Sequence, residues 1–382
     1  MKAMLISEIF PPTHGGSGRW FWELYSRLPR DEYVLAVGTS QGYQDFDKTH
    51  DLTIERLDLS SASWGIKSLS GIKFYWRTFK ELRRLIKTHQ IKQLHCGRCL
   101  PEGFMAYILN RVYGLPYKCF IHGEDVETAA LSRELSWIIR QVFHRADALI
   151  CNSQNTANLL LNKWGTSKDK TIVLHPGVDT TRFIPAERSI DVRNQLGWQD
   201  RPVILTVGRL QERKGHDVLI EAMVEIKKTI PDILYSIIGN GERKELLLAK
   251  VKKLGLEENV QFFNEISDEQ MIQAYQQCDL FVLPNRQVGN DIEGFGMVLV
   301  EAQACGKPVI AGDSGGTAET MAIDKTGFII DCTTPKPIIE KCRLLLSDKA
   351  QLQQLGVNAR TFSVNHFDWM TLSSQAKGIF IK

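Results

Sequence analysis

The first half of the chain alternates short apolar runs with longer stretches in which apolar residues recur at helical spacing. The helical patterns lie at residues 19–28, 74–88 and 103–113. The apolar runs, which we predict to be strands, lie at residues 4–7, 33–37, 92–95, 117–121, 148–152 and 171–174. Strands separated by helices are typical of a parallel sheet that is covered by helices on both faces.

The same alternation restarts after residues 182–189, which break the pattern and are a plausible linker. Strands are predicted at residues 202–207, 233–238, 260–263, 280–283, 308–311 and 327–330, and helices at residues 216–228, 243–254, 268–277 and 296–304. We therefore predict an α/β protein with two doubly wound, Rossmann-like domains at residues 1–185 and 186–366. Ligands of such sheets bind beyond the carboxyl ends of the strands, so we expect the two domains to face each other across a cleft.

The composition agrees with a soluble protein of two domains. A chain of 382 residues is too long for one ordinary core, and no apolar run reaches the length of a membrane span. The first residues, MKAMLISEIFPP, are expected to form a strand rather than a signal peptide. The eight cysteines show no framework spacing, so we expect reduced thiols in a cytoplasm. The single C-x-x-C at Cys96 and Cys99 is better explained by coincidence than by zinc.

Positive charge is concentrated in the first half of the chain. Residues 1–190 carry 25 Lys and Arg against 19 Asp and Glu, whereas residues 191–382 carry 22 against 25. The segment 67–92 holds eight basic residues and one acidic residue, with Phe74, Tyr75 and Trp76 among them. This pattern suits either docking on an anionic bilayer or a solvated helix face whose aromatics enter the core. A nucleic-acid partner is not expected, since the pI is only 8.3.

Two loops that follow predicted strands contain residues suited to phosphate. Gly15 and Gly16 follow the first strand, where backbone amides at a helix start can approach an anion, although a simple tight turn explains them equally well. Arg209 and Lys214 follow the first strand of the second domain, in VGRLQERKG. Two cations at this position suit a diphosphate, and solvated loop charge is the simpler alternative.

Two glutamates surround a glycine turn in the stretch EGFGMVLVE. Glu293 precedes the predicted helix, where it can accept hydrogen bonds from hydroxyls or act as a cap. Glu301 lies within the apolar part of that helix, where a carboxylate is costly unless it is paired or binds a ligand. A vicinal diol such as a ribose suits it, and a structural salt bridge is the alternative. His122 lies at the end of the strand 117–121, where a histidine on its own is more often structural than catalytic, although its position facing the cleft favours a role in the site.

Together these motifs resemble the family-4 retaining glycosyltransferases of GT-B fold. The shared features are GRLQERKG, the two glutamates eight residues apart, the ACGKPVIA that follows them, SGG at 314–316 and the amino-terminal Gly-Gly. The resemblance spans almost the whole chain. It implies transfer of a hexosyl unit from a UDP-, GDP- or ADP-linked sugar to an acceptor hydroxyl, with retention of configuration and without metal, cofactor or general base.

The resemblance also implies roles for individual residues. Arg209 and Lys214 would hold the donor diphosphate, and Glu301 would bind the ribose hydroxyls. Glu293 and His122 would contact the donor sugar. The other implied donor contacts are the backbones of Gly15, Gly16, Gly294, Phe295 and Gly296, and Ile266 near the base. The terminal residues 367–382 would form a helix that packs on the first domain.

Two departures from the family pattern bear on these roles. The loop GGSGRW is unusually rich in glycine and basic, so acceptor or phosphate contacts there can differ. Asn264 stands where glycine is common, although asparagine tolerates left-handed backbone geometry.

Other functions are compatible with parts of the pattern. A nucleotide-sugar epimerase of GT-B fold would convert the donor alone, and a binding module would do no chemistry. A Rossmann dehydrogenase is disfavoured because no G-x-G-x-x-G follows the first strand. The acceptor stays open between a lipid or lipid-linked molecule, with the enzyme peripheral on the inner face of a membrane, and a soluble small molecule or saccharide.

Overall fold

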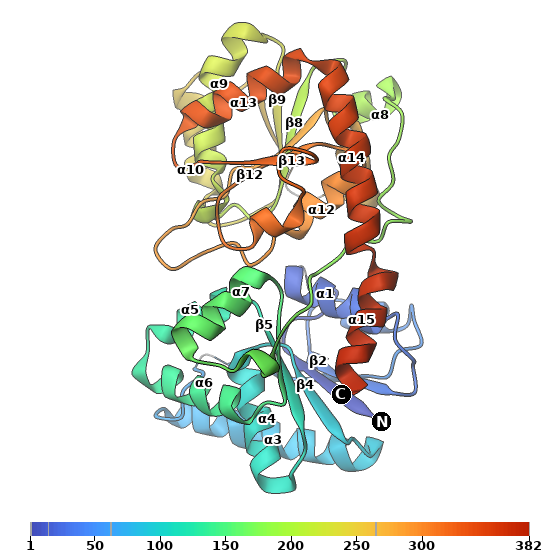
Figure 1. The fold of residues 1–382 in the computed structure, drawn as a ribbon, viewed down its shortest axis with the longest axis vertical. Helices are drawn as coiled ribbons and strands as arrows, with labels where there is room; N and C mark the ends of the chain where they lie inside the picture. The colour runs from blue at the N-terminus through green and yellow to red at the C-terminus, as the bar shows by residue number, and fades with distance from the viewer. Residues whose placement is uncertain (1, 14, 62, 264–265, 382) are drawn as a thin grey trace. The chain divides into compact units, whose positions relative to one another are not determined.

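The computed structural model describes residues 2–13, 15–61, 63–263 and 266–381. Its contacts divide the chain into two compact units, each built around one parallel sheet (Figure 1). Unit 1 comprises Met1–Pro176 together with Trp369–Lys382, and unit 2 comprises Gly177–Asp368. The predicted boundary at residue 185 lies inside unit 2, and most of the predicted terminal segment 367–382 belongs to unit 1.

Unit 1 contains a seven-stranded parallel sheet in the order β3-β2-β1-β4-β5-β6-β7. The strands are β1 (Ala3–Ser7), β2 (Tyr33–Gly38), β3 (Ile54–Leu57), β4 (Gln93–Cys96), β5 (Tyr117–Ile121), β6 (Ala148–Cys151) and β7 (Thr171–Val173). The helices are α1 (Gly16–Tyr25), α2 (Tyr43–Asp47), α3 (Leu69–His89), α4 (Phe104–Tyr113), α5 (Glu124–Ala130), α6 (Arg133–Arg145) and α7 (Gln154–Leu159). The short helical turns η1 (Cys99–Gly103), η2 (Leu160–Trp164) and η3 (Lys168–Lys170) complete this unit.

All six strands predicted in the first half are present, and one further strand was missed. The missed strand is β3, with the sequence IERL, which pairs with β2 at the edge of the sheet. Three of its four residues are only half-buried, so it lacks the continuous apolar run that marks a central parallel strand. The eight cysteines are free and buried, including Cys96 and Cys99.

Unit 2 contains a six-stranded parallel sheet in the order β10-β9-β8-β11-β12-β13. The strands are β8 (Val203–Val207), β9 (Leu234–Ile238), β10 (Val260–Phe263), β11 (Leu280–Leu283), β12 (Val309–Gly312) and β13 (Gly327–Ile330). The helices are α8 (Ile190–Gln195), α9 (His216–Thr229), α10 (Lys244–Lys253), α11 (Asp268–Gln277), α12 (Met297–Ala304), α13 (Pro335–Ser347) and α14 (Lys349–Phe367). The 3-10 turns are η4 (Glu212–Lys214) and η5 (Thr317–Thr320).

Alternating residues of the unit 2 strands enter two different cores. Val203, Leu205 and Val207 of β8 pack in the cluster that contains residues of α11 and α12. Ile204 of the same strand packs in the cluster formed with α9, α10 and α13. Both faces of the sheet are therefore buried, which explains the uninterrupted apolar runs in the sequence.

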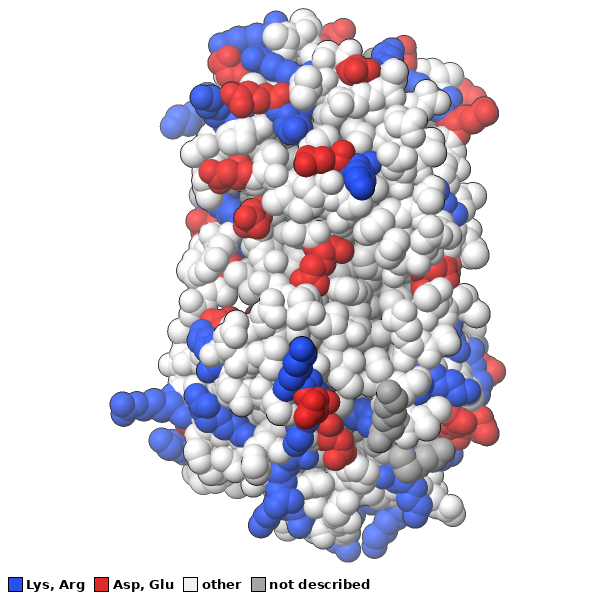
Figure 2. Space-filling view, in the orientation of Figure 1, with Lys and Arg blue, Asp and Glu red and all other residues white. Residues whose placement is uncertain are grey.

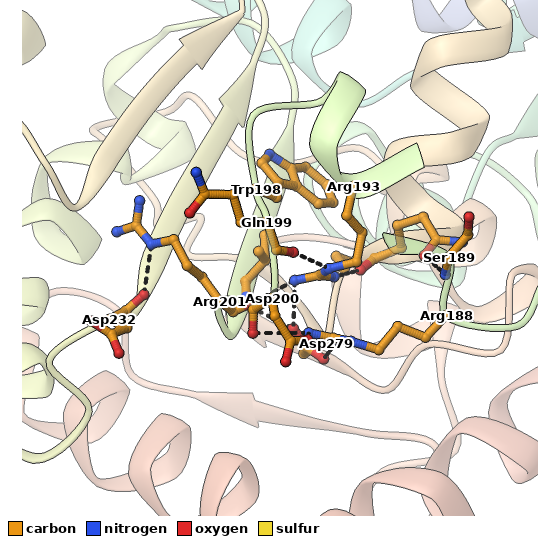
Figure 3. Close-up of polar contacts among 12 residues, drawn as sticks. Arg188, Ser189, Arg193, Trp198, Gln199, Asp200, Arg201, Asp232 and Asp279 are labelled. Carbon is orange, nitrogen blue, oxygen red and sulfur yellow. Dashed lines mark hydrogen bonds and ion pairs between the residues drawn. The ribbon is translucent and has the colours of Figure 1, made fainter. Parts of the chain in front are cut away.

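A buried arginine fixes α8 to the start of the unit 2 sheet (Figure 3). The Arg193 side chain is fully buried, and its guanidinium donates hydrogen bonds to the backbone carbonyls of Gln199, Arg201 and Gln277. Arg188 adds ion pairs with Asp200 and Asp279 (2.9 and 2.8 Å). One side chain thus satisfies two carbonyls of the loop before β8 and one at the end of α11, so the segment after the predicted linker is well anchored.

The last helix, α15 (Trp369–Ile381), packs within unit 1 (Figure 1). The ring of Phe380 lies 4.3 Å from the ring of His95 and stacks on Tyr25 at 5.9 Å, centroid to centroid. His95 is fully buried, and its Nδ1 lies 2.7 Å from the Tyr25 hydroxyl. The chain end is therefore held by a core that contains a histidine.

This histidine makes the stability of the protein depend on pH. Burial, helped by the charge of Lys118, lowers the pKa of His95 to about 3, and burial lowers the pKa of His216 in unit 2 to about 4. In the unfolded chain both titrate near 6.5, so only the unfolded state takes up these protons as the pH falls below that value. The contribution of the two neutral, buried histidines to the free energy of unfolding is complete above pH 6.5. As the pH falls below 6.5, it is lost at roughly 1.4 kcal/mol per pH unit for each fully titrating group.

We expect the free energy of unfolding to fall between pH 7.5 and pH 5, and to fall less steeply in His95→Asn. Urea unfolding at the two pH values measures both slopes. The exposed His144, changed to Asn, is the control and should leave the slope as it is in the wild type. An identical slope in His95→Asn and wild type would contradict the assignment.

Candidate functional site

The candidate donor site lies where two neighbouring strands of unit 2 end. β8 is followed by a loop and the 3-10 turn η4, and β11 is followed by the loop that leads into α12. Because β8 and β11 are paired in parallel, their carboxyl ends meet at one edge of the sheet. The side chains of η4 and of the residues before α12 are therefore brought together.

Glu293 is the centre of this site. Its Oε2 atom accepts hydrogen bonds from Lys214 Nζ and from Arg213 Nη1, both at 2.5 Å. Arg213 also pairs through Nε with Asp291 Oδ1 at 3.0 Å. Glu293, Lys214 and Arg213 are each less than a tenth exposed. The structure thus joins two of the predicted residues, Glu293 and Lys214, and adds a third that the sequence analysis did not select.

The charges of the two cations keep the Glu293 carboxyl ionised. Burial alone would raise its pKa, but Lys214 and Arg213 outweigh burial and hold the pKa below the usual value. Burial lowers the pKa of Lys214, against the attraction of Glu293. Within the described ranges no group donates a hydrogen bond to the second oxygen, Oε1. An ionised carboxylate with one occupied oxygen can accept a hydroxyl proton on the other, but it cannot act as an acid.

The backbone around Glu293 is closely packed against the SGG loop. The Glu293 carbonyl accepts a hydrogen bond from the Gly316 amide (2.9 Å), and the Glu293 amide donates to Ser314 Oγ (3.3 Å). A Cβ at Gly315 would lie 1.9 Å from the Glu293 carbonyl, so only glycine fits. Gly296 has a φ of 99°, a left-handed conformation that favours glycine, directly before α12.

The remaining residues of EGFG have different environments. Gly294 is half-buried, whereas the side chain of Phe295 is in the core and packs edge-to-face on Phe367 at 5.6 Å. The side chain of Phe295 therefore serves packing, and only its backbone is left for a ligand.

Glu301 is buried within α12 and is hydrogen-bonded to a tyrosine. The Tyr275 hydroxyl of α11 donates to Glu301 Oε2 at 2.7 Å, and both side chains are almost completely buried. A carboxylate held by a hydroxyl in an apolar helix agrees with a site that also accepts hydroxyls from a ligand.

The other predicted residues of unit 2 lie apart from these contacts. Arg209 follows β8 directly and is exposed, whereas Lys214 of the same motif is buried. Ile266 is half-buried and packs against the core cluster of β8, β11 and α12. Asn264, the departure from the family pattern, lies outside the described residues.

Sequence reasoning missed Arg213, Asp291 and Tyr275. Arg213 adjoins Lys214, and nothing in the letters ERKG shows that both cations turn inward. Asp291 and Glu293 are two residues apart in a loop, which is a signal for a shared cationic partner. Tyr275 could only have been found by pairing α11 with α12 in space.

In unit 1 the glycine-rich loop places a free helix start after β1. Helix α1 begins at Gly16, and its first turn has no side-chain cap. Both Gly15 and Gly16 are exposed, so the first amides of the helix are accessible to an anion. The Arg56 guanidinium holds this loop by donating hydrogen bonds to the carbonyls of Pro11 and Gly38, both at 2.7 Å.

His122 lies at the carboxyl end of β5, as predicted. Its Nε2 donates to the Gly97 carbonyl at 2.8 Å, and its ring packs edge-to-face on Trp20 and Phe21. Because a carbonyl can only accept, Nε2 carries a proton in this contact. These contacts give His122 a structural role, and its contact with a donor sugar stays a prediction.

No three His, Cys, Asp or Glu side chains in the described ranges are grouped so that they could hold a metal ion. No helix in those ranges combines the length and the apolar character that crossing a bilayer requires.

Comparison with known proteins identifies relatives along the whole chain. A GDP-mannose-dependent alpha-(1-6)-phosphatidylinositol monomannoside mannosyltransferase of Mycolicibacterium smegmatis is 29% identical, and the match covers 96% of this chain and 95% of the relative. A GDP-mannose-dependent monoacylated alpha-(1-6)-phosphatidylinositol monomannoside mannosyltransferase of Corynebacterium glutamicum is 28% identical, over 99% and 97% of the two chains. A D-inositol 3-phosphate glycosyltransferase of Nocardia farcinica is 30% identical over 63% of this chain and 53% of the relative.

Solved structures share the fold. HepE of Anabaena, crystallised in complex with UDP, has a TM-score of 0.83 at 20% identity and covers 100% of this chain and 99% of its own. WaaG, a glycosyltransferase involved in lipopolysaccharide biosynthesis, has a TM-score of 0.75 at 20% identity, with 99% of both chains covered. With the two parallel sheets, these likenesses confirm the predicted GT-B fold class.

Two family models account for most of the sequence. The model of glycosyl transferases group 1 matches residues 189–362, and that of Glycosyltransferase Family 4 matches residues 14–182. The predicted hexosyltransferase class is confirmed by these matches and by the full-length relatives. The chain therefore belongs to the group 1 and family 4 glycosyltransferases.

Proposed function

We propose that this enzyme transfers a mannosyl unit from GDP-mannose to a hydroxyl of a phosphatidylinositol-type lipid. The observation that carries the transferase chemistry is the ionised Glu293 carboxylate, held by two cations at the start of α12. The choice of donor and acceptor is supported by the full-length relatives, whose names give GDP-mannose and phosphatidylinositol monomannoside. The relatives named here are transferases, which favours transfer over epimerisation of the donor.

The donor chemistry follows from the charges. The leaving nucleoside diphosphate carries about two negative charges, and the sugar carbon develops oxocarbenium character. In the proposed arrangement Arg209, Lys214 and the amides before α12 stabilise the diphosphate, as preorganised electrostatics do. Glu293 Oε1 accepts a hydroxyl of the sugar. The incoming hydroxyl enters on the face that the phosphate leaves, so configuration is retained and a phosphate oxygen takes the proton.

Donor cleavage should need no divalent ion, because side-chain cations and backbone amides neutralise the leaving group. We expect transfer, or slow donor hydrolysis, to continue in the presence of a chelator at an undiminished rate. The assay is run with and without EDTA, and with magnesium or manganese added back. Activity that disappears in chelator and returns with either metal would contradict the proposal.

The donor can be tested by ligand-induced stabilisation. A ligand that binds only the folded protein raises its melting temperature, by an amount that grows with the ratio of its concentration to Kd. At equal concentrations we expect GDP to raise the melting temperature more than UDP or ADP does. A larger melting-temperature shift with UDP or ADP would show that GDP-mannose is not the donor, and it would not affect the assignment as a transferase.

The acceptor is proposed to be reached at an anionic membrane surface by the exposed face of α3. Of the aromatics in this segment, Phe74 and Tyr75 enter the core, whereas Trp76 is 61% exposed. Ile72 and Leu69, on the preceding turns, are 50% and 77% exposed. The interpretation that the aromatics enter the core therefore holds for Phe74 and Tyr75, and the exposed Trp76 supports the proposed membrane contact.

Basic side chains surround this apolar strip. The exposed basic residues of α3 are Lys73, Arg77, Lys80, Arg83, Arg84 and Lys87, and Lys80 Nζ lies 4.9 Å above the Trp76 ring. Figure 2 shows Lys and Arg gathered over the part of unit 1 that contains α3 in Figure 1. Apolar residues bordered by cations suit insertion into the headgroup region of an inner, anionic leaflet.

A carboxylate fixes the start of this surface. Glu134 of α6 accepts hydrogen bonds from the amides of Ile66 and Lys67, at 2.6 and 2.8 Å. A Cβ at Gly65 would lie 2.8 Å from that carboxylate, so the loop before α3 is closely fitted to α6. The contacts of this loop therefore fix the positions of the exposed Ile66 and Leu69 in the absence of a membrane.

We expect the protein to sediment with anionic vesicles at low salt and to be released at high salt. Each Lys or Arg near such a surface contributes about 1 kcal/mol, so Lys73→Glu with Lys80→Glu should weaken binding at least tenfold. The matched control is Lys252→Glu with Lys253→Glu on α10, which changes the net charge equally. If both variants lose vesicle binding equally, net charge alone explains the binding and α3 is not the docking surface. If the wild-type protein does not bind anionic vesicles at low salt, the membrane proposal is wrong.

One relative favours a second acceptor. The Nocardia farcinica protein is named for D-inositol 3-phosphate, a soluble molecule that shares the inositol phosphate group with the proposed lipid. Assaying inositol 3-phosphate beside phosphatidylinositol and its monomannoside separates the two sources of that chemistry.

A further inference from the structure

Arg213 occupies a position between the donor residues that neither the motif nor the family resemblance assigns. It is 5% exposed and reaches two carboxylates of the loop before α12, Glu293 through Nη1 and Asp291 through Nε. Its backbone carbonyl accepts a hydrogen bond from the Arg286 amide at 2.7 Å. Arg286 in turn forms a two-pronged ion pair with Asp217 of α9, with both distances at 2.9 Å. Arg213 therefore ties η4 to the whole loop from 286 to 293.

We infer that Arg213 is a positioning residue of the donor site, which holds Glu293 with Oε1 outward and keeps Lys214 available for the donor diphosphate. This inference rests on the roles proposed above for Glu293 and Lys214. Its basis is that both cations meet the same oxygen of Glu293, which leaves the other oxygen without a donor in the described part of the chain.

The charges give Arg213 its second effect. Without it, Lys214 and Glu293 would be a simple pair in which each neutralises the other. With it, the carboxylate is shared between two cations, so Lys214 keeps part of its attraction for an anionic ligand. The planar guanidinium can bind two carboxylates in fixed directions, which a lysine cannot do.

The two effects predict different results for two substitutions. Arg213→Met should lower kcat by about tenfold to a hundredfold, as loss of a hydrogen bond to a charged group does, and should also weaken nucleoside diphosphate binding. Arg213→Lys restores the charge without the geometry. It should bind the nucleoside diphosphate within about threefold of wild type while kcat stays reduced. A residue needed only for folding would not separate kcat from affinity in this way.

Arg243→Met is the matched control. Arg243 pairs with Glu212 of the same 3-10 turn at 3.1 Å, but at the protein surface. Arg243→Met also removes a guanidinium that pairs with a carboxylate of η4, but that carboxylate lies outside the donor site. We therefore expect kcat and nucleotide affinity to stay within about twofold of wild type.

A double-mutant cycle with Glu293→Gln tests whether Arg213 acts through Glu293. In the Glu293→Gln background, Arg213→Met should lower kcat by less than about threefold further. Full multiplication of the two losses, or an unchanged kcat in Arg213→Met and Arg213→Lys, would overturn the inference. Melting temperatures show which variants fold, and Arg213→Lys is the variant that decides the result if Arg213→Met does not.

The cycle is measured as donor hydrolysis with whichever of GDP-mannose, UDP-glucose or ADP-glucose the wild type consumes. If the proposed donor is wrong, the wild-type protein hydrolyses another nucleotide-sugar instead of GDP-mannose. A wrong role for Arg213 appears only in the comparison of the variants, so the two failures are distinguishable.

Discussion

Glu293→Gln is expected to reduce mannosyl transfer by about a hundredfold to a thousandfold, the range seen when one preorganised group of an active site is removed. The neutral amide keeps the size of the side chain but loses the charge that holds Lys214 and Arg213. A carboxylate that accepts a sugar hydroxyl orients the reacting carbon, and this orientation matters most in the transition state.

The same substitution should leave nucleoside diphosphate binding unchanged or stronger. With Glu293 neutral, both buried cations lose their carboxylate and become more attractive to a diphosphate. Calorimetry with GDP, beside single-turnover rates with GDP-mannose, measures the two quantities. Weaker GDP binding together with an unchanged rate would show that Glu293 belongs to the nucleotide rather than to the sugar.

Glu301→Ala is expected to produce the opposite result. If Glu301 holds the ribose hydroxyls, its loss removes charged hydrogen bonds of about 1.5–3 kcal/mol, or roughly tenfold to a hundredfold in nucleotide affinity. The rate at saturating donor should change little, because the ribose is bound equally in the ground state and the transition state.

Tyr275→Phe is the control for this prediction. It removes the hydroxyl that donates to Glu301 Oε2 but leaves the carboxylate and the packing of the ring in place. We expect its nucleotide affinity to stay within about threefold of wild type. GDP binding as strong in Glu301→Ala as in wild type would make the ribose assignment wrong and Glu301 a structural partner of Tyr275.

Much of the fold could be predicted because central parallel strands have a continuous apolar signature. Both faces of β8 and β11 are buried, so their sequences need no partner to be recognised. The edge strand β3 escaped because only its last residue is buried. In α3 the start at Leu69 rather than Phe74 was missed because exposed Leu69 and Ile72 interrupt the amphipathic pattern.

The candidate site was predictable as a set of residue types but not as a set of contacts. The positive φ angles of Gly296 and Gly315 explain the glycines at these positions, which the EGFG and SGG motifs indicate. Both Arg213 and Lys214 turn towards Glu293 because of the direction of their side chains in a 3-10 turn, and the sequence pattern does not encode that direction. For the same reason Phe74, Tyr75 and Trp76 looked alike, although two enter the core and one faces solvent.

The most direct test of the account is the product formed from GDP-mannose and vesicles that contain phosphatidylinositol or its monomannoside. Mass spectrometry of the lipid extract detects an added hexose, and Glu293→Gln serves as the matched inactive protein. The account predicts inositol lipid bearing one further hexose in the wild-type sample, also in the presence of chelator, and almost none with the variant. Donor consumed or isomerised with no hexose on the lipid would contradict it.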